Sequence, residues 1–265
     1  MKTNFDYTQS FLILLIFNIL LISSCDNNND DFLGKNNKNS INDVIDIDGN
    51  KYITIEIGNQ EWLGENLRTS RYRNGDIINT GLSNEEWFST TTGAYAIYPH
   101  QEIDGLNSDA EVLEAYGALY NAYAVMDSRG ICPDNWRVPN NDDWQELIDF
   151  IGNEEEIGRM LRSARTFPDA HPCWVSPFTA GTDDYGFGAL PSGSRELYYS
   201  GLGEFCNFWS NCEVGSVQGI FDVPEEGTMS IAWTMAARYH NYFTSCPSPN
   251  YAGLSVRCVR DSLNN

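Results

Sequence analysis

The stretch that decides the fold is Cys132 to Gly152, CPDNWRVPNNDDWQELIDFIG. Its second half carries the signals of a helix, since Asn140-Asn141 offers a side-chain cap and acidic residues fill the first turn. Gly152 suits the position just past the helix end. The apolar residues fall at i, i+3, i+4 and i+7 and form one stripe: Trp144, Leu147, Ile148 and Ile151. The sequence therefore predicts an amphipathic helix through 142–151, capped by Asn140-Asn141, with one buried face.

Two further helices are predicted on either side of this stretch. One runs from about Glu154 to Arg165, with apolar residues spaced for an inner face and basic residues late in the segment. A weaker helical stretch covers Asp109 to Ala115. The rest of the chain reads as short strands and loops.

Near its start, the predicted domain opens with a β-hairpin. Asp43–Ile47 and Asn50–Ile57 are strand-like, and Asp48-Gly49 between them suits a type I′ turn. Ile53, Ile55 and Ile57 alternate with polar residues, as in a half-buried strand. Asn74-Gly75 is a second hairpin signal.

The same hairpin segment begins with the spacing of a calcium loop, at Asp46, Asp48 and Asn50. An EF-hand loop needs Gly at its sixth position and Glu at its twelfth. Lys51 and Ile57 stand there instead. A hairpin turn is the better interpretation.

Beyond residue 170 the predicted strands are short and separated by Gly-, Ser-, Asn- and Pro-rich loops. The candidate strands are 187–195, 208–210, 231–233 and 254–259. Together with the helices they predict an α+β fold of loop-rich antiparallel sheets with two main helices.

The N-terminus predicts export and anchoring. Phe11–Ile22 is apolar but too short to span a bilayer, which fits the h-region of a signal peptide over residues 1–24. Ile22-Ser23-Ser24-Cys25 resembles the bacterial lipobox, in which the cysteine is acylated. Residues 25–42 are rich in Asn and Asp and form a predicted flexible tether. Its acidic residues resemble the surface-export tag of Bacteroidetes-like lipoproteins. An uncleaved anchor is the alternative.

Cysteine usage agrees with this compartment. Of seven cysteines, lipid attachment would use Cys25 and leave six, an even number. In an exported protein these allow up to three disulfides, with 15 connectivities.

Charge restricts the partners. The net charge of −21 opposes nucleic-acid binding, which depends on Lys and Arg neutralising phosphates. It also opposes adsorption to anionic lipids, so the expected membrane contact is through the acyl anchor.

Collinear segments of the chain resemble the Fibrobacter succinogenes major paralogous domain, found in predicted lipoproteins of Fibrobacteres and Bacteroidetes. The resemblance covers about residues 43–261, and its segments are Asp46–Tyr52, Ile57–Trp62, Glu65–Leu67, Tyr116–Asn121, Cys132–Pro139, Trp144, Gly186–Pro191, Phe208–Ser210 and Ser255–Arg260. It implies an exported, anchored protein and no particular reaction.

A more distant resemblance implies a finer fold. Trp136–Pro139 with Asp143-Trp144, and the closing Gly253–Arg257, are similar to segments of formylglycine-generating-enzyme-like domains. Those domains have the C-type-lectin-like fold, in which the first and last strands pair and a cysteine near a helix often bridges to the last strand. We therefore expect a disulfide-stapled C-type-lectin-like domain with a Cys132–Cys258 bridge. The pairing of the other four cysteines stays open, and Cys206–Cys212 with Cys173–Cys246 is the arrangement we suggest.

No constellation in the sequence predicts catalysis. His100, His171 and His240 lack metal-ligand spacing, so no metal and no cofactor is expected. His171-Pro172-Cys173 places an imidazole near a thiol, but sequence neighbours rarely face each other, and an oxidising compartment favours a disulfide. An enzyme of formylglycine-generating type is the alternative, by analogy alone.

Aromatic residues predict binding. Seven Trp and 14 Tyr are many for this length, and aromatic rings stack on sugars and anchor protein interfaces. Four of them in the loop-rich half are candidate ligand-binding residues: Tyr198, Tyr199, Trp209 and Tyr242. The competing interpretation places Trp62, Trp136, Trp144 and Trp209 in the core. The calcium-dependent sugar signatures of C-type lectins are absent from the sequence.

The sequence thus predicts a lipoprotein of the outer membrane or cell surface, with the periplasm-facing side as the alternative. Its single domain is expected to bind or display, and a glycan or a protein ligand is open. A structural component of the envelope is the third candidate function.

Overall fold

The computed structural model describes residues 44–176, 178–214, 229–236, 241 and 243–262. Cys25, the predicted signal peptide, the tether and Tyr242 lie outside these residues. The strands in chain order are β1 (Val44–Ile45), β2 (Lys51–Tyr52), β3 (Thr54–Ile57), β4 (Gln60–Leu63), β5 (Tyr95–Ala96), β6 (Leu119–Tyr120), β7 (Ser192–Arg195), β8 (Tyr199–Leu202), β9 (Phe205–Val214), β10 (Met229–Ala236), β11 (Thr244–Pro249) and β12 (Val259–Asp261). The helices are α1 (Asn84–Ser89), the 3₁₀ turn η1 (His100–Glu102), α2 (Asp109–Tyr116), α3 (Ala122–Val125), α4 (Asn141–Ile151) and α5 (Ile157–Leu161).

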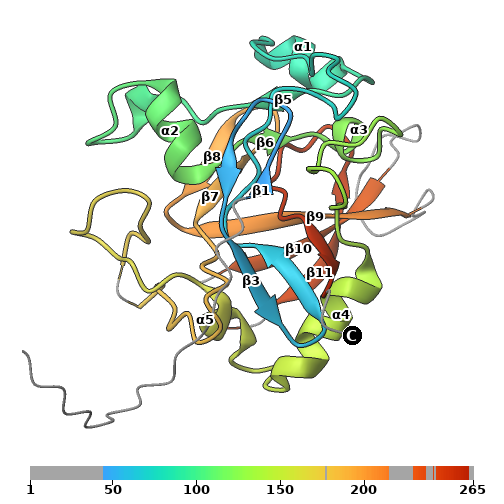
Figure 1. Cartoon of the computed structure of the whole chain (residues 1–265). Coiled ribbons are helices and arrows are strands. Elements are labelled where there is room, and N and C mark those ends of the chain that lie inside the picture. Colours follow the sequence, from blue (N-terminus) through green and yellow to red (C-terminus); the bar gives the residue numbers. More distant parts are fainter. Residues whose placement is uncertain (1–43, 177, 215–228, 237–240, 242, 263–265) are drawn as a thin grey trace, which may run out of the picture. The chain divides into compact units, whose positions relative to one another are not determined.

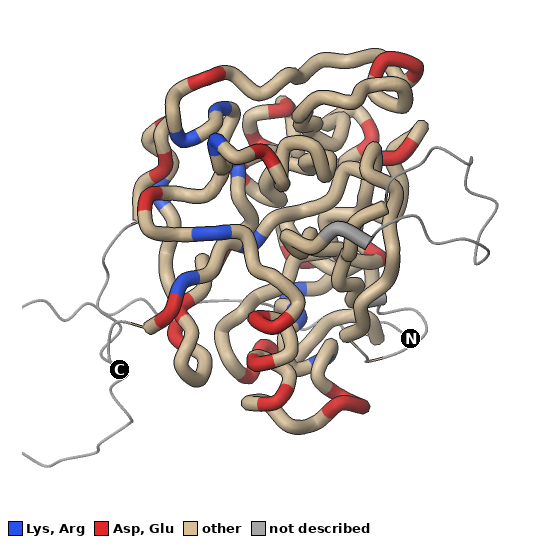
Figure 2. Tube along the Cα trace, turned by 90° about the vertical axis from the view of Figure 1, so that its right-hand side faces the viewer, with Lys and Arg blue, Asp and Glu red and all other residues tan. Residues whose placement is uncertain are grey.

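The strands form several small sheets, so the fold is α+β with mainly antiparallel pairing. The largest sheet has the order β11-β10-β9-β7-β8, in which β7 and β9 meet in parallel at Gly193 and Cys206. A three-stranded sheet has the order β12-β4-β3. Helices α4 and α5 lie at one end of the fold, and α1 and α2 lie at the opposite end (Figure 1). Acidic residues recur along much of the trace (Figure 2).

Helix α4 forms as its sequence predicts. The Asn140 side chain accepts a hydrogen bond from the Asp143 amide, and the Asp143 carboxylate accepts one from the Asn140 amide, completing a capping box. Gly152 ends the helix with a φ of 73°, where a side chain would be strained. The stripe from Trp144 to Ile151 is buried.

The helix predicted over 154–165 is shorter than expected. Helix α5 covers only Ile157–Leu161, because Arg162 is extended and pairs with Ala189 in a parallel bridge. Ile157 and Leu161 are buried as predicted. The weaker prediction near Asp109 is confirmed by α2.

The first hairpin is confirmed, but its turn is not type I′. Strands β1 and β2 pair, and among the turn residues only Gly49 has a positive φ, of 86°. The Asp46 carboxylate accepts hydrogen bonds from the amides of Asp48 and Asn50, which fixes a different turn. These contacts also give Asp46 a structural role in place of calcium binding. The second hairpin turn, with an Arg71–Ile77 bridge around Gly75, is confirmed.

The expected alternation of isoleucines holds only in part. Ile57 is buried and Ile55 is partly buried, but Ile53 is exposed, because the chain changes partner between β2 and β3. After that change β3 pairs with β4.

The core at the α4 end is a cluster of six aromatic rings, with Trp144 at its centre. The Trp144 ring centroid lies 4.7 Å from that of Trp62, 5.3 Å from Phe243 and 5.8 Å from Phe208. Phe187 and Trp233 complete this aromatic cluster. Trp62, Trp136, Trp144 and Trp209 are all buried, as the core interpretation predicts.

A buried arginine and a disulfide hold the C-terminal segment. The Arg257 guanidinium donates to the carbonyls of Leu63 and Phe187 and to Asn66 Oδ1, and it stands 4.6 Å from the centre of the Phe187 ring. Burial lowers its pKa to about 10. The expected Cys132–Cys258 disulfide is present. It joins the segment before α4 to the residue before β12.

Candidate functional site

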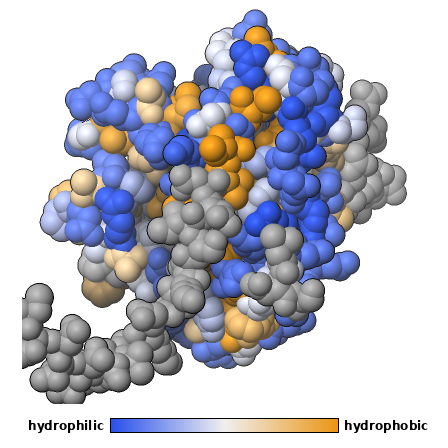
Figure 3. Space-filling model, viewed as in Figure 1, coloured by the Kyte–Doolittle hydropathy of each residue, from blue (hydrophilic) through white to orange (hydrophobic). Residues whose placement is uncertain are grey.

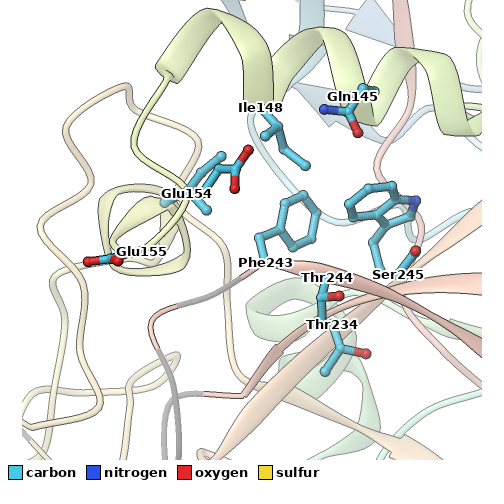
Figure 4. A pocket seen from close by; sticks show the side chains of 10 residues that line it. Gln145, Ile148, Glu154, Glu155, Thr234, Phe243, Thr244 and Ser245 are labelled. Carbon is cyan, nitrogen blue, oxygen red and sulfur yellow. The ribbon is translucent and has the colours of Figure 1, made fainter.

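The candidate site is a cavity of about 640 Å³ at the α4 end of the fold. Its walls come from α4, the loop after it, the start of α5 and the adjacent strands β10 and β11. The volume is typical of sites for small molecules, which span about 300–1,000 Å³. Figure 4 shows α4 above the cavity and the two strands below it.

The floor is aromatic and held in place. The ring centroids of Trp233 and Phe243 are 5.1 Å apart, and both rings pack against Trp144. The indole Nε1 of Trp233 donates to Asn141 Oδ1 at 3.2 Å, which fixes the orientation of the ring. Ile148 from α4 adds an aliphatic wall beside them (Figure 4).

A rim of polar side chains surrounds this floor. Thr244 and Ser245 are exposed on β11, and Gln145 is exposed on α4. The Glu154 carboxylate points toward Ile148 and Phe243, whereas Glu155 lies further along the loop (Figure 4). These groups offer hydroxyl, amide and carboxylate hydrogen-bonding partners around an apolar centre.

Electrostatics favour a neutral or positively charged ligand here. Glu154 and Glu155 line the cavity, and no Lys or Arg is among its lining residues in the described part of the chain. A ligand carboxylate or sulfate would therefore meet like charge.

The three predicted ligand-binding residues that the structure describes, Trp209, Tyr199 and Tyr198, are not among the residues that line this cavity. Trp209 is wrong as a ligand contact, since it is fully buried and its Nε1 donates to the Tyr120 carbonyl. Tyr199 packs against Tyr98, with ring centroids 5.1 Å apart, and under the Arg195 guanidinium. Tyr198 is exposed but does not line the cavity.

The residues that do line the cavity were missed at the sequence level. Trp233 was recognised only as part of a strand, and Gln145 only as part of a helix. Ile148 and Phe243 are about a hundred positions apart in the chain, so no local pattern joins them. The sequence offered only a weak signal of this site, namely the two hydroxyl residues Thr244-Ser245 next to an aromatic residue.

Two expected disulfides are absent. Cys206 and Cys212 lie on the same strand, β9, roughly 15 Å or more apart, whereas a disulfide needs Cα atoms within about 7 Å. Cys206 is fully buried and unbonded. Cys173 and Cys246 are also unbonded, and the Cys246 thiol lies 3.3 Å from the Thr234 hydroxyl.

His171 and Cys173 meet a third residue instead of each other. Tyr116 Oη lies 2.5 Å from His171 Nδ1 and accepts a hydrogen bond from the Cys173 amide at 3.3 Å. Burial raises the pKa of the Cys173 thiol, so it is not the thiolate that a nucleophile requires.

The described residues show neither a metal-binding cluster nor a membrane-crossing helix. No group of three or more His, Cys, Asp or Glu side chains is arranged to hold a metal ion within the described ranges. Within the same ranges, no helix has the length and apolar character to cross a bilayer.

The fold and the site define a disulfide-bonded α+β domain with an aromatic-floored cavity. The family model of the Fibrobacter succinogenes major domain matches residues 55–260. The chain therefore belongs to this family, as its sequence segments predict. No curated protein and no solved structure matches the chain.

Proposed function

We propose that this protein is a lipid-anchored binding module whose cavity between α4 and the β10–β11 pair takes a neutral glycan. The observation that carries the proposal is the combination of a fixed aromatic floor, Trp233 and Phe243, with a rim of hydrogen-bonding side chains. A sugar ring has an apolar face that packs on aromatic rings and hydroxyls at its edge that hydrogen-bond.

The rim supports specificity for uncharged sugars. The side chains of Glu154, Thr244 and Ser245 make no hydrogen bond within the described part of the chain, so they are available to sugar hydroxyls. The carboxylates oppose uronic and sialic acids through charge repulsion.

The proposed anchor is Cys25, at the outer membrane or the cell surface, with a periplasm-facing position as the alternative. Support comes from the short apolar run before Cys25 and the Asn- and Asp-rich segment after it. The test is a Cys25→Ser variant expressed with its signal segment. We expect the variant in the soluble fraction and the wild-type chain in the membrane fraction. Equal membrane retention of both would contradict the acyl anchor.

We further propose that the fold is C-type-lectin-like and distantly related to formylglycine-generating-enzyme domains. The last strand, β12, pairs with β4 near the start of the domain, which supports this relation. The Cys132–Cys258 bridge between the pre-helix segment and the last strand supports it too. The relation concerns the fold and carries no activity.

The binding proposal is tested with the folded mature chain on an array of neutral, amino-bearing and acidic glycans. We expect neutral glycans among the bound set and acidic ones absent from it. Binding restricted to acidic glycans, or none at all, would overturn the glycan proposal. In the second case, a weakened envelope after gene deletion would favour a structural component.

Rim variants locate the binding. Gln145→Ala is expected to weaken a bound neutral glycan about tenfold, the loss of roughly one hydrogen bond. Glu154→Gln is expected to reduce the discrimination against acidic glycans. The matched controls are Gln101→Ala and Glu85→Gln, which lie outside this cavity and are exposed. Equal effects of the rim and control variants would place the ligand elsewhere.

A further inference from the structure

A second cavity, of about 470 Å³, lies beside α2 and the turn that follows η1. Its other walls are the loop from Phe167 to Val175 and the end of β8. It shares no lining residue with the aromatic-floored cavity in the described part of the chain. The glycan proposal does not use it.

Much of the wall of this second cavity is apolar and open. Phe167 is 69% exposed and Val175 is 54% exposed, and Ile103 and Leu202 line the cavity with them. The space-filling view shows small hydrophobic areas within a mainly hydrophilic face (Figure 3). An exposed phenyl group at a cavity mouth favours a ligand with an apolar body.

The back of the cavity is polar. Tyr116 Oη accepts the Cys173 N–H and lies within hydrogen-bond distance of His171 Nδ1, so one hydroxyl joins the two residues. The Cys173 side chain is only 5% exposed, lines the cavity and has no hydrogen-bond partner for its sulfur among the described residues.

The charge of the lining comes from three carboxylates: Glu102, Asp104 and Asp169. None of them forms an ion pair with a basic side chain of the described chain. Arg165 does not line the cavity, and its guanidinium donates to the carbonyls of Ala170 and His171. An ammonium group in the cavity would therefore meet negative charge, and no Lys or Arg is among the described lining residues.

We propose that this second cavity binds a small organic amine, with the ammonium group near the three carboxylates and an apolar body against Ile103, Phe167 and Leu202. The His171 imidazole and the buried Cys173 thiol form the polar end of the site. The carboxylates select for the cation, and the apolar wall selects for an alkyl or aryl body.

The test uses 2-phenylethylamine as the probe, titrated into the mature chain by calorimetry. The matched probes are 2-phenylethanol, which lacks the charge, and 3-phenylpropionate, which reverses it. We expect the amine to bind at least about tenfold more tightly than the alcohol and the carboxylate not to bind. Equal binding of amine and alcohol would overturn the charge selection.

Two variants locate the amine and control for the acidic surface. Glu102→Gln/Asp104→Asn/Asp169→Asn is expected to lose amine binding. Glu85→Gln/Asp134→Asn/Asp142→Asn removes the same number of charges from exposed positions outside the cavity and should keep it. Equal loss in both triple variants would show nonspecific attraction to the net negative charge.

Methyl NMR gives a readout that does not depend on those variants. The methyl signals of Ile103, which lines the cavity, should shift and saturate with the amine, while those of Ile78 in a different core cluster stay in place. Unmoved Ile103 signals at saturating amine would place the bound amine elsewhere and overturn the proposal.

Discussion

The two cavities are built in different ways, and the difference shows how one acidic chain can offer two kinds of binding surface. The aromatic-floored cavity lies between regular elements, α4 and the β10–β11 pair, and its rings are fixed by Trp144. The second cavity lies between turns and loops, and its polar end depends on Tyr116 and the hydrogen bonds around it. The first is suited to shape and stacking, and the second to charge.

The disulfide supports the frame behind both cavities, so its removal is expected to have the largest effect. Cys132→Ser/Cys258→Ser opens a loop with a sequence separation of 126 residues. The chain-entropy model gives a loss of roughly 5 kcal/mol in unfolding free energy. Urea denaturation of the oxidised wild type and the variant measures it. Cys246→Ser, an unbonded cysteine, is the control and should change stability little.

Trp144→Ala is expected to affect the aromatic-floored cavity and to leave the second cavity intact. The ring is fully buried at the centre of the aromatic cluster, so its truncation is expected to cost about 4 kcal/mol of unfolding free energy. The floor of the first cavity loses its support, and glycan affinity should fall in the fraction that remains folded. Amine binding to the second cavity should persist in that folded fraction. Loss of both activities in a folded variant would show that the cavities are coupled.

The buried Cys206 thiol predicts that the free energy of unfolding depends on pH. Desolvation raises the pKa of Cys206 to about 12, from an ordinary value near 9. The unfolded thiol therefore ionises first, and the stability present below pH 9 is lost between pH 9 and pH 12. The slope from this group is about 1.4 kcal/mol per pH unit. Chemical denaturation at pH 8 and pH 10 should show a smaller loss of stability for Cys206→Ala than for wild type. An identical loss in both proteins would contradict the role of Cys206 in this pH dependence.

Tyr116→Phe tests the polar end of the second cavity, and of these variants it has the smallest expected effect on stability. The change removes one hydroxyl that joins His171 to the Cys173 amide, a loss of about 1 kcal/mol in unfolding free energy. The His171 imidazole then loses its Tyr116 hydrogen-bond partner, so the NMR signals of the His171 ring should change. Tyr198→Phe, an exposed tyrosine, is the control.

Local signals predicted local structure well. Helix α4 follows its sequence because the cap, the stripe and the terminal glycine all lie within one segment. The second predicted helix was too long because Arg162 bonds to a distant strand-like residue, Ala189, and such a partner is invisible to a local pattern. The type I′ turn was wrong because the Asp46 carboxylate, outside the Asp-Gly pair, determines the turn.

The site was harder to predict than the fold. Composition indicated that aromatic rings matter, but it could not show which rings line a cavity, so Trp209 was chosen and Trp233 was not. Cysteine parity allowed up to three bridges, but it could not show that the spacing along β9 separates Cys206 from Cys212. The Cys132–Cys258 pair was predicted from the resemblance to C-type-lectin-like domains, in which a cysteine near a helix often bridges to the last strand, and it is present.

The most direct test of glycan binding in the aromatic-floored cavity is methyl NMR during titration with a neutral oligosaccharide that the array selects. Ile148 and Ile157 line the cavity, and Ile78 is buried in a different core cluster and serves as the reference. The account predicts shifts at Ile148 and Ile157 that saturate together and are absent at Ile78. Saturable binding that leaves both lining methyl groups unmoved would contradict the assignment of this cavity.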